Sequence, residues 1–304
     1  MNITIRTLKI GVFEKFAPYL PDRLYLRLKY WVYTGSKLHI DNPVTFNEKL
    51  QWLKLYGRRP IDTILADKIA VKEYISKTIG SEYVIPLLGV WNSFDEIEFD
   101  KLPNQFVLKT SHDSGGVVVC KDKSKLDIVR VKTKLSKSLR RNYFTYSRET
   151  AYKEIPRKIF AEAYMEDSKT KELRDYKFFC FNGKVHFFKV DFGRFTQHRA
   201  NYYDVSCKLL NFGEKICPPD YNANIEIPES IYQMITLAEK LSYNIPFVRI
   251  DFYYIDGRIF FGEFTFSPAG GMGLFTDGKI DAQLGTLITL PNIEFTLKSR
   301  RADL

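Results

Sequence analysis

The 304-residue chain carries 46 Lys and Arg against 36 Asp and Glu, a net charge of +10, and 45% of its residues are hydrophobic. This length and composition suit a soluble globular protein of one large or two closely packed domains, and no run of about 18 apolar residues predicts a membrane-spanning helix. The basic charge favours acidic partners such as nucleotides, acidic glycans or anionic lipids. No zinc-finger spacing or RNA-recognition motif is found, so we expect no nucleic-acid partner.

The cysteines and the N-terminus indicate a cytoplasmic protein. Cys120, Cys180, Cys207 and Cys217 are scattered and form no CxxC motif, which fits reduced thiols. The N-terminal sequence MNITIRTLKIGVFEKF lacks an apolar run followed by a cleavage site, as a signal peptide would have.

A first helix is expected within PDRLYLRLKYWVYTG, with Pro21 near its start and Gly35 after its end. Its polar residues are mostly Arg and Lys. Two interpretations stay open: a cover helix packed on the core, or a contact with a membrane surface or a lipid-linked substrate. In the second case the protein would work at the inner face of the membrane.

Two more helices are expected before the first strands. TFNEKLQWLKLYG has Thr45 and Glu48 at capping-box spacing and Gly57 as a stop signal. DKIAVKEYISKTIG predicts an amphipathic helix from about Asp67 to Ile79.

Short apolar runs and hairpins follow these helices. Asn182-Gly183 is a strong two-residue turn signal between aromatic-rich strands. Because helices and antiparallel hairpins mix along the chain, the predicted fold class is α+β. Strands are predicted at 82–91, 105–111, 117–122 and 157–165 and in hairpins at 172–193 and 248–265, and further helices at 124–150 and 228–243.

The segment VRIDFYYIDGRIFFGEFTFSPAGG (248–271) has charged residues toward the far ends of its two strands. A two-residue Asp-Gly turn would direct Asp251 and Glu263 to opposite sides of the sheet. A three-residue loop with Gly257 left-handed sets Arg249 opposite Glu263, with Asp251 diagonal to them. The apolar alternation favours this second register, with a shared face made of Val248, Ile250, Phe252, Phe260 and Phe264.

Two carboxylates that converge on one face repel each other unless a cation lies between them. Oxygen ligands without His or Cys favour Mg²⁺, and Arg249 beside them can hold an oxyanion. The alternative is a cross-strand ion pair between Arg249 and Glu263 on an exposed face. The residues alone leave both interpretations open.

Three further stretches are candidates for chemistry. In FVLKTSHDSGGVVV, Lys109 ends a strand before a glycine loop, which is either an anion site or a plain hairpin turn. In ELRDYKFF, Asp175 and Lys177 alternate with aromatic residues, so both can face one cleft. A basic cluster could grip an acidic substrate or be a simple loop; it consists of Arg194, His198 and Arg199.

The order of these pieces resembles the ATP-grasp ligases: Asp-Lys at 67–68, Lys109 and its glycine loop, Glu162 before a linker, Asp-x-Lys at 175–177 and Arg-x-Asp…Glu-x-Thr at 249–265. The sequence is more specifically similar to the teichuronopeptide-biosynthesis (TupA-like) branch, found with bacterial surface-polysaccharide genes. The matching phrases are NPVTFNEKLQWLKL, ADKIAVKEYI, LPNQFVLKTSHDSGG, DYKFFCFNGK and VRIDFYYIDGRIFFGEFTFSPAGG, and they span most of the chain.

This resemblance implies two α+β subdomains whose antiparallel sheets clasp ATP. It implies an N-terminal helical segment (1–60), an N-terminal ATP-grasp subdomain with the glycine loop (61–158), a C-terminal subdomain with the metal site (159–291) and a tail (292–304). Residue roles follow by position: phosphate contacts from Lys68 and Lys109; a mobile loop of Ser114, Gly115 and Gly116; an adenine hinge of Glu162, Ala163, Tyr164 and Met165; a ribose contact from Asp175; magnesium ligands Asp251 and Glu263; and catalytic Arg249 and Lys177.

Two positions depart from the family pattern. The usual Glu-x-Asn is Glu263-x-Thr265 here, which puts a third metal ligand in question. The glycine loop carries Asp113, an acid close to the expected triphosphate.

The activity implied is an ATP- and Mg²⁺-dependent carboxylate–amine ligase that forms an amide through an acyl phosphate. Its expected partners are an amino acid or other amine and a hexuronic acid of a bacterial capsular or surface polysaccharide, or a precursor of it. The alternatives are a glycosyltransferase of polysaccharide biosynthesis, for which no DxD-type motif is found, a non-catalytic glycan-binding protein, and a small-molecule kinase with the same ATP clasp.

Overall fold

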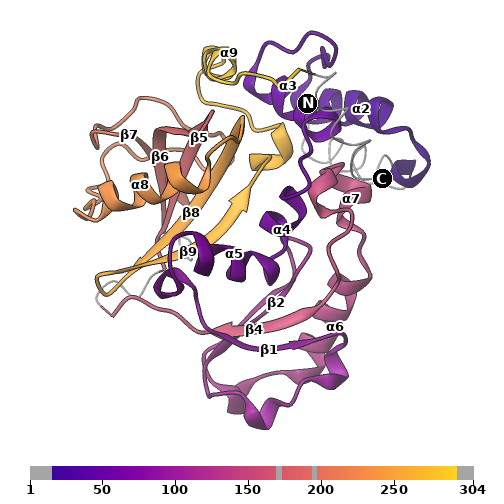
Figure 1. Ribbon diagram of the computed structural model, residues 1–304, viewed down its shortest axis with the longest axis vertical. Coiled ribbons are helices and arrows are strands. Elements are labelled where there is room, and N and C mark those ends of the chain that lie inside the picture. The colour runs from indigo at the N-terminus through magenta and orange to yellow at the C-terminus, as the bar shows by residue number, and fades with distance from the viewer. Residues whose placement is uncertain (1–15, 169–172, 194–196, 293–304) are drawn as a thin grey trace.

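The computed structural model describes residues 16–168, 173–193 and 197–292, which form two antiparallel sheets surrounded by helices (Figure 1). The smaller sheet has the strand order β1-β4-β2-β3, and the larger sheet has the order β7-β6-β5-β8-β9. This mixture of helices and antiparallel strands confirms the predicted α+β class.

The strands are β1 (Leu87–Trp91), β2 (Phe106–Thr110), β3 (Val117–Cys120), β4 (Ile159–Ala163), β5 (Asp175–Phe181), β6 (Lys184–Phe192), β7 (Arg199–Asp204), β8 (Phe247–Ile255) and β9 (Arg258–Thr265). The helices are α2 (Asp22–Thr34), α3 (Phe46–Tyr56), α4 (Asp62–Ala66), α5 (Ala70–Thr78), α6 (Ile128–Arg140), α7 (Tyr143–Ser147), α8 (Ile231–Leu241) and α9 (Lys279–Thr286). A 3₁₀ turn, η7 (Pro268–Gly271), follows β9.

The local signals in the sequence place most of these elements. Thr45 and Glu48 form the predicted capping box of α3, and Gly35 ends α2 with a φ of 77°. The predictions missed α4, β7 and α9, and the helix expected from Asp67 begins at Ala70. Of the predicted tail, residues 293–304 lie outside the described part of the chain.

β4 begins at the predicted subdomain boundary, residue 159, yet it pairs with β1 and β2 of the smaller sheet. A division by sheets would therefore come after Ala163. The proposed subdomain limits remain a prediction.

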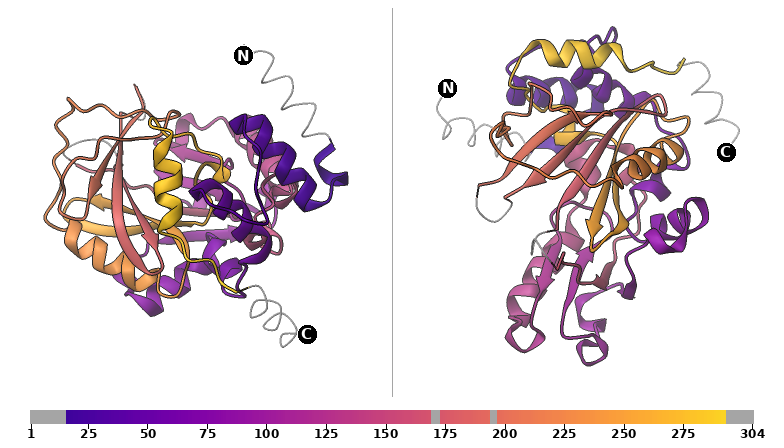
Figure 2. Two further views of the ribbon diagram at one scale, coloured as in Figure 1. Left: turned by 90° about the horizontal axis from the view of Figure 1, so that it is seen from above. Right: turned by 90° about the vertical axis from the view of Figure 1, so that its left-hand side faces the viewer.

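The larger sheet has one apolar face and one divided face. Along β5, Tyr176 and Phe178 point into a core that α8 and α5 cover. On the other face, Phe179 packs in a cluster with residues of α3 and α9, and these two helices lie together across that end of the sheet (Figure 2). Lys177 and Asp175 continue the same alternation beyond the helices. The charged half of this face is thus not covered by α3 and α9, and it faces the smaller sheet.

The β8–β9 hairpin differs from its prediction. Its loop has two residues, Asp256 and Gly257, with φ of 48° and 82°, which is the left-handed pair that an Asp-Gly turn favours. Gly257 therefore has the predicted positive φ, but the three-residue loop is wrong. Phe261 consequently packs in the core beside Phe252, where Phe260 was expected.

A β-bulge restores the alignment that the two-residue turn would have lost. The register shifts between Asp251 and Phe252, so that Asp251 pairs with Glu263 and Arg249 with Thr265. The extra residue is Gly262, where an added Cβ would lie 3.0 Å from the Asp251 carbonyl oxygen. The carboxylates therefore share a face, although by a different route from the one predicted.

The cover-helix interpretation holds for one face of α2. Tyr25, Leu26 and Tyr30 are buried in a cluster with Trp52 of α3. In the described residues, no helix combines the length and the apolar character needed to cross a membrane.

Candidate active site

Two adjoining cavities lie between the sheets. The larger has a volume of about 260 Å³ and a strongly charged lining. The smaller, of about 190 Å³, is lined mainly by apolar side chains. The two are contiguous, because the same five residues line both: Ile85, Lys109, Val117, Glu162 and Tyr253.

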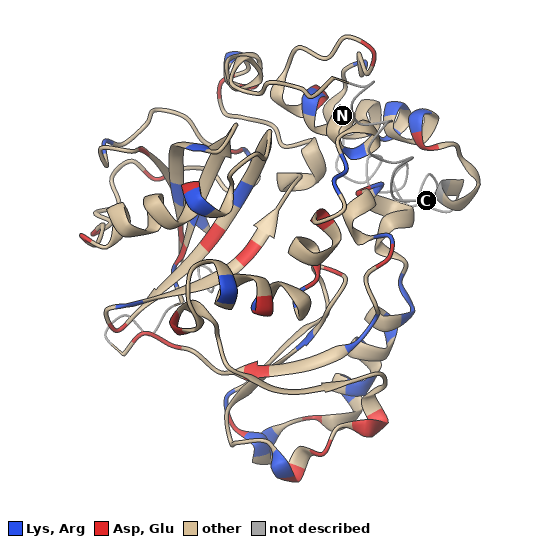
Figure 3. Ribbon diagram, in the orientation of Figure 1, with Lys and Arg blue, Asp and Glu red and all other residues tan. Residues whose placement is uncertain are grey.

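The charged lining of the larger cavity differs from the sequence prediction at two residues: Lys72 is added, and Arg249, predicted as a catalytic residue, lies behind Asp251 and does not line the cavity. Figure 3 shows acidic residues within β4, β8 and β9, the strands that border this space. The charged side chains are Lys68, Lys72, Lys109, Lys177, Glu162, Asp175, Asp251 and Glu263.

Glu162 of β4 holds two lysines at the wall shared by the cavities. Its Oε1 lies 2.6 Å from Lys72 Nζ and its Oε2 lies 2.5 Å from Lys109 Nζ. Burial would raise the pKa of Glu162, but the two ammonium groups outweigh it and keep the pKa below its usual value. Glu162 therefore stays ionised and orients both cations.

Asp251 lies between two cations. Arg249 donates to it twice, from Nε to Oδ1 and from Nη2 to Oδ2, both at 2.7 Å. Lys177 Nζ donates to Oδ2 at 2.8 Å and lies 3.6 Å from Asp175 Oδ1. Burial would lower the pKa of Lys177, but the carboxylates of Asp251 and Asp175 raise it. Lys177 therefore stays charged although it is buried.

Glu263 joins this cluster from β9. Arg249 Nη2 lies 3.2 Å from its Oε1, so the ion pair considered from the sequence exists, but Arg249 is only 11% exposed and the pair belongs to a buried cluster. Thr265 accepts a hydrogen bond from Arg249 and donates one to Glu263 at 3.2 Å. Thr265 thus orients Glu263, whose side chain remains 45% exposed.

Asp113 closes the glycine loop on itself. Its carboxylate accepts hydrogen bonds from the Thr110 and Ser138 hydroxyls and from the Gly116 amide. Burial would raise the pKa of Asp113, but these hydrogen bonds outweigh it and lower the pKa. The acid that departs from the family pattern is therefore turned into the loop and supports its shape.

The loop residues differ in the space around them. An added Cβ at Gly116 would lie 1.9 Å from Thr110 Oγ1, whereas at Gly115 the nearest atom would be 4.0 Å away. Ser114 lines the larger cavity. Lys68 Nζ donates to the Asp113 carbonyl at 2.5 Å, and burial lowers the Lys68 pKa. Lys68 is thus held against the loop.

The chain after β4 lines the smaller cavity. Ala163, Tyr164 and Met165 all take part in this lining, together with valines of β2 and β3. The Tyr164 hydroxyl donates to Glu166, whose carboxylate lies 3.1 Å from Lys121 Nζ. An apolar slot beside an irregular stretch of chain suits a flat heterocycle.

Three polar residues that matter for these linings were missed by sequence reasoning, besides Lys121 and Glu166 at the smaller cavity. Lys72 lies on α5, where the sequence gives no sign that separates it from a solvated lysine. Asp191 lines the smaller cavity and pairs across the sheet with Asp175. Tyr253 follows Asp251 in the same alternation and lines both cavities.

The two described residues of the predicted basic cluster lie outside the cavity linings, although one of them contacts a lining residue. Among the described residues, His198 and Arg199 line neither cavity. His198 Nε2 lies 3.5 Å from Asp191 Oδ2, and Arg199 begins β7. Arg194 lies outside the described residues.

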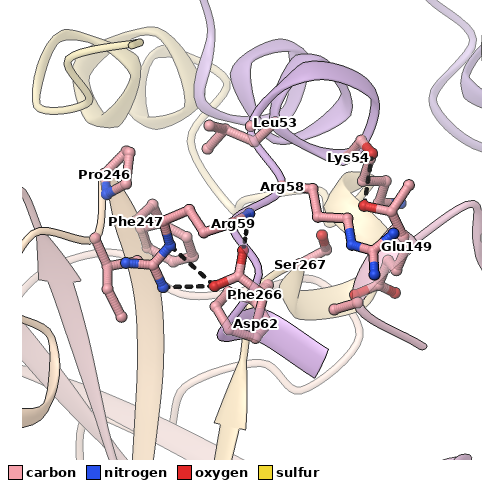
Figure 4. A pocket seen from close by; sticks show the side chains of 14 residues that line it. Leu53, Lys54, Arg58, Arg59, Asp62, Glu149, Pro246, Phe247, Phe266 and Ser267 are labelled. Atoms are coloured by element: carbon pink, nitrogen blue, oxygen red, sulfur yellow. Dashed lines mark hydrogen bonds and ion pairs between the residues drawn. The ribbon is translucent and has the colours of Figure 1, made fainter. Parts of the chain in front are cut away.

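A third cavity, of about 50 Å³, adjoins the chain that leaves β9 (Figure 4). Lys54 of α3 donates to the Gly270 carbonyl at 2.6 Å, and burial lowers its pKa to about 8. Glu149 lines the same cavity, and burial raises its pKa. In Figure 4, Arg59 and Asp62 form an ion pair, with Nη2 2.5 Å from Oδ1. Charged groups that line this third cavity, among them Lys54, Arg59 and Asp62, thus already have partners within the protein.

The sequence matches the family model described as TupA-like ATPgrasp over residues 48–289. The comparison with curated proteins gives no match. Similar solved structures include the D-alanine–D-alanine ligase of Bacillus anthracis, at 17% identity and a TM-score of 0.44, covering 83% of this chain and 76% of that one.

D-alanyl-alanine synthetase A of Vibrio cholerae is similar at 15% identity and a TM-score of 0.45, covering 83% of this chain and 71% of that one. The ATP-grasp ligase PsnB, solved with its minimal precursor, Mg and ADP, is similar at 12% identity and a TM-score of 0.39, covering 72% and 57%. The family assignment comes from the sequence match, which spans most of the chain. The chain belongs to the TupA-like ATP-grasp family and has the ATP-grasp fold.

Proposed function

We propose that the protein is an ATP- and Mg²⁺-dependent ligase that joins a carboxylate to an amine, the carboxylate being a hexuronic acid of a bacterial capsular or surface polysaccharide or of its precursor. One observation carries the proposal. The contiguous cavities are apolar at one end, and four lysines and four carboxylates line the other.

The linings fit a nucleoside triphosphate. The smaller cavity offers an apolar slot for the base beside Ala163 and Tyr164. The larger cavity offers ammonium groups for the phosphates, with Lys68 at the glycine loop and Lys109 on β2. A polyanion would replace the partners that these lysines now have, the Asp113 carbonyl for Lys68 and the Glu162 carboxylate for Lys109, because charge-assisted hydrogen bonds to phosphate are strong.

The donor set also fits Mg²⁺. Asp251 and Glu263 lie opposite each other on β8 and β9, and both line the larger cavity. Among the described residues, no group of three or more His, Cys, Asp or Glu side chains could hold a metal ion alone. Mg²⁺ commonly takes one or two carboxylates and completes its shell with phosphate oxygens and water. When bound, Mg²⁺ supplies neutralisation of phosphate charge.

The chain's own residues then have distinct tasks. A carboxylate is a poor electrophile, and phosphorylation gives it a good leaving group. Lys68 and Lys109 would hold the phosphates in line for this transfer, and Arg249 would stabilise the negative charge that develops when an amine attacks the acyl phosphate. Lys177 keeps Asp251 oriented through its 2.8 Å contact.

The test is a turnover assay. The protein is incubated with ATP, Mg²⁺ and paired sets of uronic acids and amino acids, and ADP, phosphate and amide product are measured. ADP release that requires both an acid and an amine, with an amide formed in equal amount, is the expected result.

Other outcomes point to other activities. ADP release that requires the acid alone, with a stable phosphorylated product, indicates a kinase. Transfer from a nucleotide-sugar without ATP indicates a glycosyltransferase. Failure to bind any nucleotide in calorimetry would overturn the ligase proposal and leave a glycan-binding protein.

A further inference from the structure

Helix α2 is apolar on two opposite faces. Tyr25, Leu26 and Tyr30 face the protein and are at most 4% exposed. A surface helix normally has one apolar stripe and a polar outer face. The outer face of α2 does not follow this rule.

The outer face presents an apolar stripe to solvent. Leu24, Leu28 and Trp31 are 45%, 38% and 56% exposed, and their spacing of four and three residues places them on one side of the helix. Just before the helix, Phe16 and Tyr19 are 59% and 83% exposed. We call Leu24, Leu28 and Trp31 the α2 stripe. Exposed apolar groups gathered in one place mark interaction surfaces, whereas scattered ones need no explanation.

Basic groups flank the α2 stripe. Arg23 and Arg27 lie beside it, with side chains 48% and 49% exposed, and both pair with Asp41. Residues 16–41 contain four Lys and Arg but two Asp, and the whole chain carries +10. The two acids are already bound by arginines, since Asp22 lies 2.8 Å from Arg148 Nε. The surroundings of the stripe therefore attract anions.

This combination has a specific chemistry. Trp and Tyr prefer the headgroup level of a bilayer, leucines on one helical face enter the acyl boundary, and flanking arginines bind anionic headgroups. We propose that the α2 stripe docks the protein on the surface of an anionic lipid bilayer, with α2 lying in the plane of the interface. This surface is separate from the cavities, so the proposal does not depend on the ligase activity.

Vesicle sedimentation tests the proposal with the full chain. Binding is measured to vesicles of phosphatidylcholine alone and to vesicles that also hold about 30% phosphatidylglycerol, at low and high salt. The test variant is Leu24→Ser/Leu28→Ser/Trp31→Ser. The matched control is Ile128→Ser/Val129→Ser on α6, whose side chains are 43% and 77% exposed. Thermal unfolding checks that both variants fold.

The wild type and the α6 control should bind the anionic vesicles and dissociate from them in high salt. The affinity of the triple variant for these vesicles should be lower by roughly tenfold or more. Trp31 fluorescence should shift to the blue on binding, and Trp31→Phe should remove most of that shift. No binding of the wild type to anionic vesicles, or equal binding by the triple variant, overturns the proposal. A dimer that only the triple variant abolishes, without lipid binding, would assign the stripe to a second copy of the chain.

Discussion

Arg249 and Asp251 lie two residues apart on β8 and form a two-pronged ion pair, with 2.7 Å in each arm. Residues i and i+2 of a strand point to the same face, so the strand itself aligns the pair. Lys177 completes the neutralisation of Asp251 from β5. Asp251 therefore has a structural role in addition to the metal-binding role that we propose for it. The structural role of Glu263 is smaller, because its side chain is 45% exposed.

We expect Asp251→Asn and Glu263→Gln to differ in stability but not in activity. Each should lower kcat at least ~100-fold, because each removes a proposed magnesium ligand. Asp251→Asn should also cost about 3–5 kcal/mol in the free energy of unfolding, since it removes the nearest carboxylate of two buried cations. Glu263→Gln, at a side chain 45% exposed, should cost about 0.5 kcal/mol or less. Full activity in Glu263→Gln would remove Glu263 from the site.

Lys72 should contribute to nucleotide binding although its role is not evident from a motif. Lys72→Met should raise the Kd for ATP roughly tenfold to a hundredfold, because it removes a buried charge-assisted contact beside Glu162. Lys77→Met on the same helix is the control, since Lys77 is 74% exposed and pairs only with Glu73 in the described contacts. Calorimetric titration with ATP measures both. Equal affinities in the two variants would make Lys72 a structural partner of Glu162.

The glycines of the loop should respond differently to a methyl group. Gly116→Ala should destabilise the fold, by about 1–3 kcal/mol, because its Cβ would meet the Thr110 and Ser138 hydroxyls. Gly115→Ala has space and should leave the unfolding temperature unchanged. If the loop closes on phosphates, as the family resemblance implies, Gly115→Ala should still raise the KM for ATP. Unchanged kinetics in Gly115→Ala would contradict that close approach.

The buried carboxylate of Asp113 should make the free energy of unfolding depend on pH in the acid range. Its pKa is lowered in the folded state, so its stabilising contribution is present above the unfolded pKa, 3.8, and is lost as the pH falls through the folded value. Asp113→Asn should remove this contribution. The difference in unfolding free energy between wild type and variant should therefore shrink as the pH is lowered from about 6 to about 2. Denaturant titrations at each pH measure this difference. A difference that stays constant across the pH series would contradict the prediction.

Helix α3 should hold in place the turn at residues 269–273, which follows β9. Gln51 is fully buried and donates to the Gly270 and Gly271 carbonyls at 3.0 and 2.6 Å. Gln51→Ala should destabilise the protein by about 1–3 kcal/mol and speed amide exchange in residues 269–273. Lys49→Ala is the control on the same helix, because Lys49 donates to Ile288 instead. Equal exchange in both variants would show that α3 does not hold this turn.

Much of the site was predictable because its signals are local or ordered. The alternation of charged and aromatic residues predicts that Asp175 and Lys177 share a cleft, and both line the larger cavity. The order of Lys68, Lys109, the glycine loop and the β8–β9 charges indicated the family, which the sequence match then shows. Lys72 was missed because a lysine on a helix is normally a solvated one, and only its contact with Glu162 distinguishes it.

The β8–β9 hairpin separates what the sequence determines from what the tertiary structure decides. The sequence alone determined the two strands, the place of the turn between them and the positive φ of Gly257, because these depend on the conformational preferences of neighbouring residues. The length of the loop was predicted wrongly, since the apolar alternation favoured three residues and the structure has two. The bulge at Gly262 could not be predicted, since it arises where the packing of Phe264 in the core competes with the register set by the turn. That long-range compromise places Asp251 opposite Glu263 and thereby forms the candidate metal site.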